Sequence, residues 1–260
     1  MFGQVTHALT RSPGQSYLQG LTQSTDGPPN LARTLQQHQA YCQALTACGV
    51  LVTNLPADEA YPDGCFIEDT AIVTPRGAII TRPGAPSRSG ETTAVAAALT
   101  ERYAHIARIE APGTLDGGDI LETDSAFIIG ISERTNAHGA QQLQHLLADL
   151  GYPSNILDVR DCKQLLHFKT GVSAIAPGLL VMAPNLPDFP ALRGYEKITL
   201  TAAEQYAANC ILVNGTVFVP TGCPKFIAAL TQRHLPFIEL EMSEFKKMDG
   251  GLSCLSLRVP

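Results

Sequence analysis

Three side chains of this sequence could together perform nucleophilic catalysis: Cys254, His167 and Asp116. A cysteine nucleophile needs a partner that moves protons, and the imidazole that serves it often needs an orienting carboxylate. Such sets assemble in space from distant positions of the chain. Each residue alone is more often structural, because a cysteine in an apolar segment usually packs as a small hydrophobic side chain. The set is a catalytic hypothesis only if the fold brings the three residues together.

Carboxylates also stand beside two Gly-Gly pairs, each just before a predicted strand. Asp116 and Asp119 flank the first pair, and Asp249 precedes the second, five residues before Cys254. Glycines at such positions permit unusual backbone angles and let a ligand approach the backbone closely. A tight turn with solvated acids is the alternative for either segment, and the recurrence of the pattern makes a functional role an equal alternative to the turn.

A third acidic group consists of Asp63, Glu68 and Asp69. Glu68 and Asp69 are adjacent in an apolar segment, residues 66–73, that we predict to be a strand, so their side chains should point to opposite faces. One of them must then meet the interior, where an uncompensated carboxylate costs several kcal/mol. Either a structural ion pair or a cationic substrate would supply the missing positive charge.

Two arginines are candidates for binding the carboxylate of a substrate. Arg88 and Arg134 each lie in a loop between a predicted strand and a predicted helix. The planar guanidinium group binds carboxylates through two parallel hydrogen bonds. A solvated loop arginine is the alternative interpretation for both.

The elements that must position these residues form a repeated module of two strands, a helix and a third strand. The copies begin near residues 66, 118, 172 and 210, and their predicted helices cover residues 91–102, 140–150 and 224–234. The third copy shows no clear helix. Asn214-Gly215 between two apolar runs is a strong hairpin signal.

A fifth copy is divided between the two ends of the sequence. Residues 253–259 would supply its first strand, residues 5–9 its second, residues 31–48 its helix and residues 50–52 its last strand. Joining the end to the beginning closes a ring, which leaves no unpaired first or last unit. We therefore predict an α/β fold with a single domain over residues 1–260, built as a five-bladed propeller of ββαβ units.

Composition excludes several classes of protein. The net charge of −6 and the absence of a basic run argue against a nucleic-acid partner. No apolar stretch approaches the ~20 residues of a membrane helix, and the first residues do not resemble a secretory signal. None of the seven cysteines forms a C-x-x-C pair, so we expect free thiols, a cytoplasmic protein and no metal site.

Six segments, taken together and in order, resemble dimethylarginine dimethylaminohydrolases, members of the guanidino-modifying superfamily with the five-bladed pentein fold. The segments are residues 55–59, 62–63, 66–69, 81–88, 114–119 and 249–254, and the resemblance spans nearly the whole chain. It implies that Cys254 is the nucleophile, His167 the general acid and base, and Asp116 the carboxylate that orients the imidazole. The match around His167 is the least distinctive part.

The resemblance also implies a set of residues that bind the substrate. Asp69 and Asp249 would hold the guanidinium group, with Glu68 as a supporting acid. The amino-acid end would be held by Asp63, Arg88 and Arg134, with Leu18 on a mobile loop beside the pocket and Met248 next to it. The polar loop 19–29 is either a lid that excludes water or an inert surface loop.

The implied reaction converts asymmetric dimethylarginine or monomethylarginine to L-citrulline and an amine through a covalent thiouronium intermediate, without a metal or cofactor. An arginine deiminase would attack the same carbon and release ammonia, but such enzymes generally carry an additional helical segment. An amidinotransferase and a non-catalytic propeller are further alternatives. The sequence leaves the preferred methylation state open, and a homodimer is a further expectation.

Overall fold

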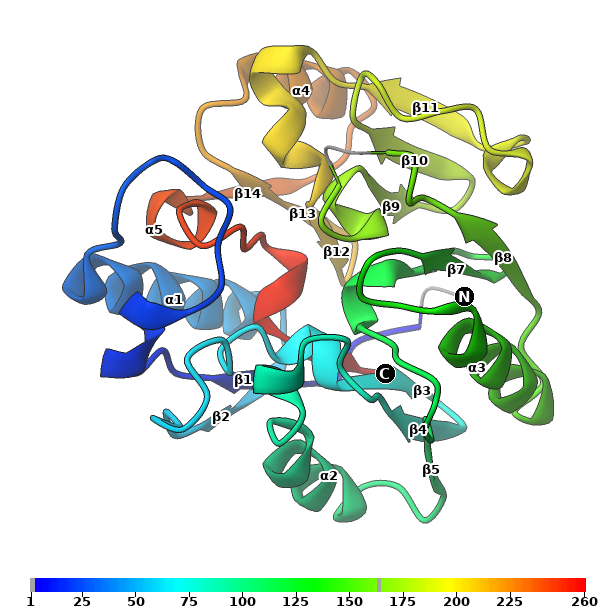
Figure 1. Cartoon of the computed structure of the whole chain (residues 1–260). Helices are drawn as coiled ribbons and strands as arrows, with labels where there is room; N and C mark the ends of the chain where they lie inside the picture. Colours follow the sequence, from blue (N-terminus) through cyan, green and yellow to red (C-terminus); the bar gives the residue numbers. More distant parts are fainter. Residues whose placement is uncertain (1–2, 163–164) are drawn as a thin grey trace.

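A computed structural model of the chain describes residues 3–162 and 165–260, and these residues form a ring of small sheets (Figure 1). Within the described residues, fifteen strands make five three-stranded sheets. Helices α2, α3 and α4 lie on the outside of the ring, and the inner strands approach its centre. The predicted five-bladed α/β propeller is confirmed.

The first complete blade illustrates the module. Strand β3 (Ala71–Thr74) pairs antiparallel with β4 (Gly77–Ile80), helix α2 (Thr92–Thr100) follows, and β5 (Ile106–Arg108) pairs parallel with β4. A parallel pair requires a crossover connection, which α2 supplies on the outer side of the sheet. The central strand of this blade is therefore the second strand of the module.

Three further blades repeat this order with different connections. Their elements are β6 (Ile120–Glu122), β7 (Phe127–Ile131), α3 (Ala137–Asp149) and β8 (Ser154–Asp158); β9 (Val172–Ala176), β10 (Leu179–Met182) and β11 (Glu196–Thr199); and β12 (Ile211–Val213), β13 (Thr216–Pro220), α4 (Pro224–Gln232) and β14 (Phe237–Leu240). Asn214 and Gly215 both have positive φ, as the predicted tight hairpin requires.

The blade of β9, β10 and β11 lacks an α-helix between its last two strands. Only the short 3-10 helix η6 (Pro190–Leu192) lies there. Pro187 and Pro190 remove backbone donors and fix φ, which prevents a longer helix in this stretch. This explains why the sequence shows no helical pattern in the third copy.

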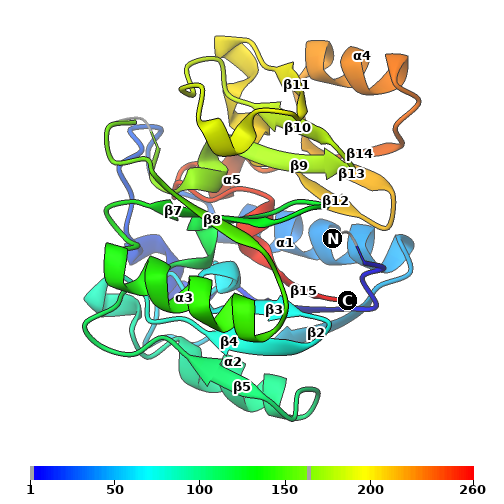
Figure 2. The same cartoon turned by 90° about the vertical axis from the view of Figure 1, so that its right-hand side faces the viewer.

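The fifth blade closes the ring with the two ends of the chain. Strand β15 (Leu257–Val259) pairs antiparallel with β1 (His7–Arg11), which pairs parallel with β2 (Leu51–Leu55). The helix of this blade is α1 (Leu31–Ala47), whose N-cap Asn30 accepts a hydrogen bond from the backbone N–H of Arg33. Gly3, the first described residue, lies beside Pro260 at this seam, and Figure 2 shows the chain near both ends on the same side of the molecule.

The hydrophobic core is also divided into five parts. Each of the five buried clusters combines side chains of two neighbouring blades; for example, one cluster contains both Ile79 of β4 and Ile129 of β7. The clusters therefore hold neighbouring blades together, and each described blade shares its buried side chains with the blades beside it. In the described part of the chain, no helix is both long and apolar enough to cross a membrane.

The ends of the inner strands differ from the prediction. Five of the short 3-10 helices precede them, namely η2 (Ile67–Thr70), η4 (Gly117–Asp119), η5 (Phe168–Thr170), η7 (Ala202–Ala208) and η8 (Ser253–Leu255). Neighbouring members of this set contact one another around the axis. The prediction that residues 66–70 and 253–255 belong to strands was wrong, because the tight 3-10 turn lets adjacent blades meet at the narrow centre.

Three further short elements complete the described part of the chain. They are η1 (Gln15–Gln19), η3 (Pro86–Arg88) and α5 (Ser243–Lys246). Helix α5 was not predicted, and it places Met248 and Asp249 just beyond its end. Asp249 has a φ of 56°, an uncommon left-handed conformation for a residue other than glycine.

Candidate active site

A small cleft at the centre of the ring contains most of the residues singled out from the sequence. Its volume is about 30 Å³. The lining includes the predicted residues Asp63, Asp69, Arg88, Arg134, His167, Met248, Asp249 and Cys254, together with Leu21, Phe66, Leu166 and Gly250. Residues from four different blades therefore meet at one place.

His167 and Asp116 form a buried pair beside this cleft. The His167 Nε2 atom lies 3.0 Å from Asp116 Oδ2. The second oxygen, Oδ1, accepts a hydrogen bond of 2.8 Å from the backbone N–H of Gly84. Asp116 is fully buried and is held from both sides, so it fixes the orientation of the imidazole ring.

The electrostatic surroundings favour the protonated form of His167. Burial lowers the pKa of the imidazole, but the charges of Asp69, Asp119 and Asp116 and the hydrogen bond to Asp116 together raise it to about 9. Burial alone would raise the pKa of the Asp116 carboxyl, and the contact with His167 lowers it below its usual value. At neutral pH the pair is thus an imidazolium beside a carboxylate.

Asp119 anchors the backbone next to His167, a role that was not predicted from the sequence. Its Oδ1 accepts a 2.9 Å hydrogen bond from the backbone N–H of Phe168, the residue after His167. Its Oδ2 accepts 2.6 Å hydrogen bonds from the hydroxyl groups of Ser132 and Thr135. The position of Asp119 after a Gly-Gly pair was the available signal, and its complete burial identifies it as a structural acid.

Cys254 lies in η8, where its sulfur accepts a 3.4 Å hydrogen bond from the backbone N–H of Gly251. Burial raises the pKa of the Cys254 thiol to about 12, and the charges of Glu68 and Asp69 act in the same direction. The free protein therefore holds a neutral thiol next to carboxylates. A cation bound at Asp69 would offset part of this negative charge and favour ionisation of the thiol.

The glycines of the two acidic segments are needed for close packing at the centre. A Cβ atom on Gly118 would lie 2.7 Å from the His167 ring, and one on Gly117 would lie 2.1 Å from the backbone oxygen of Glu68. A Cβ on Gly250 would lie 2.2 Å from the Phe66 ring. These glycines let the central turns approach one another, so they have a packing role at the centre of the ring.

Asp69 is bound to protein donors in this structure. Its Oδ1 accepts a 2.8 Å hydrogen bond from the Gly118 backbone N–H, and its Oδ2 lies 2.6 Å from Arg88 Nη1. Arg88 also forms a two-pronged pair with Glu91, with contacts of 3.0 and 2.8 Å. Arg88 lines the cleft as predicted, but its guanidinium is directed to carboxylates of the protein.

The loop 20–26 covers the cleft by binding two of its acids. The backbone N–H of Leu21 donates to Asp63 Oδ1 at 3.0 Å, and that of Gln23 donates to Asp249 Oδ2 at 2.6 Å. The hydroxyl of Thr22 lies 3.1 Å from the same Asp249 oxygen. The loop therefore contacts the site directly, and an inert surface loop is the weaker of the two interpretations.

Two of the predicted substrate-binding residues, Leu18 and Glu68, do not line the cleft. Leu18 is exposed on η1, and Leu21 lies over the cleft in its place. The Glu68 side chain faces a separate cavity, where it contacts Lys169, Ser253 and Arg258. The expectation that Glu68 belongs to the guanidinium-binding cluster is not met by this arrangement, because the 3-10 turn directs Glu68 and Asp69 to opposite sides of the ring centre.

A metal ion has one candidate set of ligands in the described part of the chain. Single ligand atoms of Asp69, Asp116 and His167 lie within 4.8 Å of one another. His167 and Asp116 already satisfy each other, and Arg88 and Gly118 satisfy Asp69. The donor set fits a proton-transfer pair with a neighbouring acid at least as well as a metal centre.

A cysteine, a His–Asp pair and acids for a cation, set at the centre of a five-bladed α/β ring, are the features of a guanidino-modifying enzyme. Residues 59–188, half of the chain, match the arginine deiminase family. The chain is 41% identical to N(G),N(G)-dimethylarginine dimethylaminohydrolase of Pseudomonas aeruginosa, over 97% of this chain and 98% of the relative. The chain thus belongs to the dimethylarginine dimethylaminohydrolase family.

Solved structures agree with this assignment. The Pseudomonas aeruginosa dimethylarginine dimethylaminohydrolase, as a Cys-to-Ser mutant complexed with citrulline, superposes with a TM-score of 0.95 at 40% identity, covering 98% of this chain and 100% of that chain. A His-to-Gly dimethylarginine dimethylaminohydrolase, as an adduct with S-methyl-L-thiocitrulline, gives a TM-score of 0.94 with the same identity and coverage.

Proposed function

We propose that this protein hydrolyses Nω-methylated arginines to L-citrulline and methylamine or dimethylamine, with Cys254 as the nucleophile. The observation that carries the proposal is the meeting of Cys254, the His167–Asp116 pair and the acids Asp69 and Asp249 in one cleft. The relatives support it, since one binds citrulline and another forms an adduct with a thiocitrulline.

The acids prepare both the substrate and the nucleophile. Asp69 and Asp249 would bind the guanidinium nitrogens, each charge-assisted hydrogen bond contributing about 1.5–3 kcal/mol. The bound cation also lowers the pKa of the Cys254 thiol, because it offsets the negative charges that raise it in the free protein. The thiolate then attacks the guanidinium carbon and forms the C–S bond of a tetrahedral intermediate.

His167 moves the protons of both half-reactions. As an imidazolium it donates a proton to the departing amine, the C–N bond breaks, and an S-linked thiouronium remains on Cys254. The now neutral imidazole takes a proton from a water molecule, which attacks the same carbon. The C–S bond then breaks, the sulfur leaves as a thiolate, and citrulline is released.

The remaining cleft residues would bind the amino-acid end of the substrate. A cleft of about 30 Å³ has room for only a few waters, so the loop 20–26 must open before an arginine-sized molecule enters. The incoming guanidinium would replace Arg88 at Asp69, which leaves Arg88 and Arg134 to pair with the substrate carboxylate. Closure of the loop then excludes water during the first step.

The purified protein, assayed with dimethylarginine, monomethylarginine and arginine, tests the proposal. Citrulline from the methylated substrates is the expected result. Citrulline and ammonia from arginine alone would instead indicate a deiminase, and no citrulline from any of the three would indicate a non-catalytic member of the fold. We also propose a cytoplasmic location, since the seven cysteines are all unpaired; a homodimer stays a prediction that light scattering can test.

Alkylation of Cys254 by iodoacetamide should be slow near neutral pH in the free protein. With the thiol pKa raised to about 12, the reactive thiolate increases with pH throughout the range from pH 7 to 10. A guanidinium ligand that is not turned over should accelerate the reaction at pH 7. Peptide mass spectrometry measures the rate at Cys254; a plateau below pH 8 without ligand would contradict the expectation.

The pH dependence of kcat/KM should show a descending limb near pH 9. His167 must carry a proton to protonate the leaving amine, and its pKa is raised from 6.5 to about 9, so the competent form is present below that value and lost above it. Initial rates of citrulline formation between pH 6 and 10.5 test this. A limb centred near pH 6.5 would show that the carboxylates do not raise the pKa of His167.

A further inference from the structure

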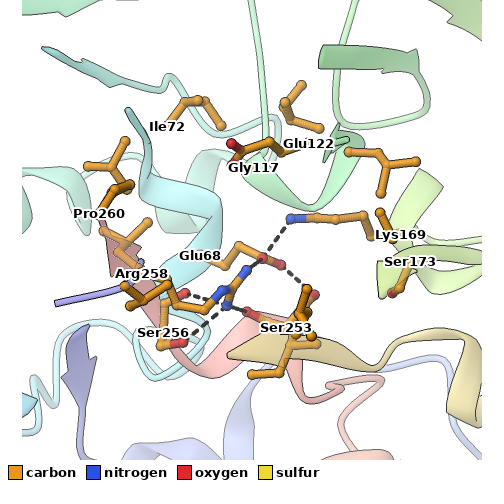
Figure 3. Close-up of a pocket in the computed structure, with 18 of the residues that line it drawn as sticks. Glu68, Ile72, Gly117, Glu122, Lys169, Ser173, Ser253, Ser256, Arg258 and Pro260 are labelled. Atoms are coloured by element: carbon orange, nitrogen blue, oxygen red, sulfur yellow. Dashed lines mark hydrogen bonds and ion pairs between the residues drawn. The ribbon is translucent and has the colours of Figure 1, made fainter. Parts of the chain in front are cut away.

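A second cavity of about 500 Å³ lies behind the central turns, and it shares no lining residue with the cleft. Figure 3 shows Glu68, Lys169, Ser253 and Arg258 converging in it. Two of the central turns, η2 and η8, divide their residues between the two sides. Asp69 and Cys254 face the cleft, whereas their chain neighbours Glu68 and Ser253 face this rear cavity.

The Glu68 carboxylate connects three of these turns. Its Oε2 accepts a 2.6 Å hydrogen bond from the hydroxyl of Ser253, the residue before Cys254. Its Oε1 lies 2.6 Å from Lys169 Nζ, two residues after His167, and 3.2 Å from Arg258 Nη2. We call Ser253–Leu255 the nucleophile turn and His167 with Phe168–Thr170 the base turn. One buried carboxylate thus touches both.

Asn209 makes a second connection between the same two turns. Its side-chain oxygen accepts a 2.9 Å hydrogen bond from the Ser253 backbone N–H, and its amide nitrogen donates to the Lys169 backbone oxygen at 3.2 Å. A Cβ on Gly251 would lie 2.4 Å from the Asn209 side chain, so this glycine makes the contact sterically feasible. Ser253 and Lys169 are therefore bridged twice, by two different side chains.

We propose that Glu68 and Asn209 are positioning residues, which together fix the nucleophile turn against the base turn. Glu68 acts through the hydroxyl of Ser253 and does not contact the substrate. The two turns belong to different blades and are far apart in sequence, so no local backbone hydrogen bond sets their separation. A displacement of about 1 Å between reacting groups can reduce a rate by about 10²-fold.

The ion pairs of Glu68 should keep the nucleophile turn and the base turn linked at all times. Lys169 and Arg258 supply two cations to one carboxylate, and all three side chains are largely buried. Removal of one partner from a buried ion pair leaves an uncompensated charge and is strongly destabilising. The link is therefore rigid and persistent, which is what the placement of a reacting sulfur requires.

The Ser253→Ala variant is the sharpest test, because it removes one hydroxyl without changing any charge. This inference rests on the proposed function, so citrulline formation is the readout. We expect kcat to fall about 10- to 100-fold, while KM changes less than about threefold because no substrate contact is lost. Ser173→Ala is the matched control: Ser173 lines the same cavity but donates to the Ala208 backbone oxygen, so its kcat should be unchanged.

Two measurements separate positioning from general loosening of the fold. The melting temperatures of the two serine variants should agree within a few degrees. In Glu68→Gln, a negative charge near Cys254 is lost, so the pH dependence of iodoacetamide alkylation should shift to lower pH although kcat falls. A misfolded Glu68→Gln protein would leave Ser253→Ala as the decisive variant.

The outcomes for the function and for the inference differ. A wild-type protein that forms no citrulline would overturn the proposed function. A wild-type protein that is active, together with a Ser253→Ala variant whose kcat is within twofold of it, would overturn the positioning role alone. A large rise in KM with unchanged kcat in Ser253→Ala would show that the rear cavity affects substrate binding, and this result would also overturn the positioning role.

Discussion

Replacement of Cys254 by Ser should reduce citrulline formation from dimethylarginine at least about 10³-fold, in line with the losses seen when a nucleophile is removed from other hydrolases. Serine has nearly the same shape as cysteine, but its hydroxyl ionises far less readily at the pH of the assay. The bound cation can lower the pKa of a thiol into a useful range, and an alcohol stays protonated there. Steady-state assays at pH 7.5 and a circular dichroism spectrum measure activity and fold together.

The control for this experiment is Cys48→Ser. Cys48 lies at the end of α1, away from the cleft, and its replacement should leave kcat unchanged. Release of dimethylamine by the Cys254→Ser protein at the normal rate would show that the sulfur of Cys254 is not the nucleophile. Retained substrate binding in a variant without turnover would support the assignment, because the acids that bind the guanidinium are untouched.

Replacement of His167 by Gln should lower kcat about 10²- to 10⁴-fold, the usual contribution of general acid–base catalysis. The variant lacks the proton donor for the leaving amine and the base for the attacking water. If activation of the attacking water is impaired more than departure of the amine, the thiouronium adduct accumulates on Cys254. Mass spectrometry of protein quenched during turnover would detect the added mass, located on the peptide that contains Cys254.

A surface histidine provides the matched comparison. His145 is exposed on α3, so His145→Gln makes the same chemical change outside the cleft and should have normal kinetics. A His167→Gln protein with normal turnover would exclude His167 from both proton transfers. A strongly impaired variant without any adduct would mean that the first step, the departure of the amine, limits its rate.

The ring architecture was predictable because it depends on local signals that repeat. Apolar strands in pairs, the Asn214-Gly215 turn and the helix of each copy are short-range patterns, and the divided copy at the ends indicates closure. The observed bounds of α4 and β9 begin where the pattern placed them. The third copy could not be completed, since Pro187 and Pro190 replace the helix by an irregular crossover.

The central turns could not be predicted, because tertiary contacts decide them. Residues 66–70 have the composition of a strand, but they form a 3-10 turn where four neighbouring turns crowd the axis. The prediction that Glu68 and Asp69 point in opposite directions was correct, but it rested on the alternation of a strand, and these residues form a 3-10 helix. It could not show that Glu68 reaches Lys169, because that contact joins positions about a hundred residues apart in different blades.

The loop over the cleft shows a related limit. Resemblance pointed to Leu18, and the structure places Leu21 over the acids with its backbone N–H bound to Asp63. Backbone donors have no sequence signature, since every residue except proline has one. The roles of Leu21 and Gln23 depend on the path of the loop, which only coordinates reveal.

The pairing of β15 with β1 makes the order of assembly important for this protein. Residues His7 and Val259 are register partners, so one end of the chain must find the other across some 250 intervening residues. Cys254 stands just before that last strand, and its partners come from blades formed earlier along the chain. A ribosome-bound or partly folded chain would have the imidazole and the acids but would lack a seated sulfur. Hydrolytic competence would thus arise only when the ring closes.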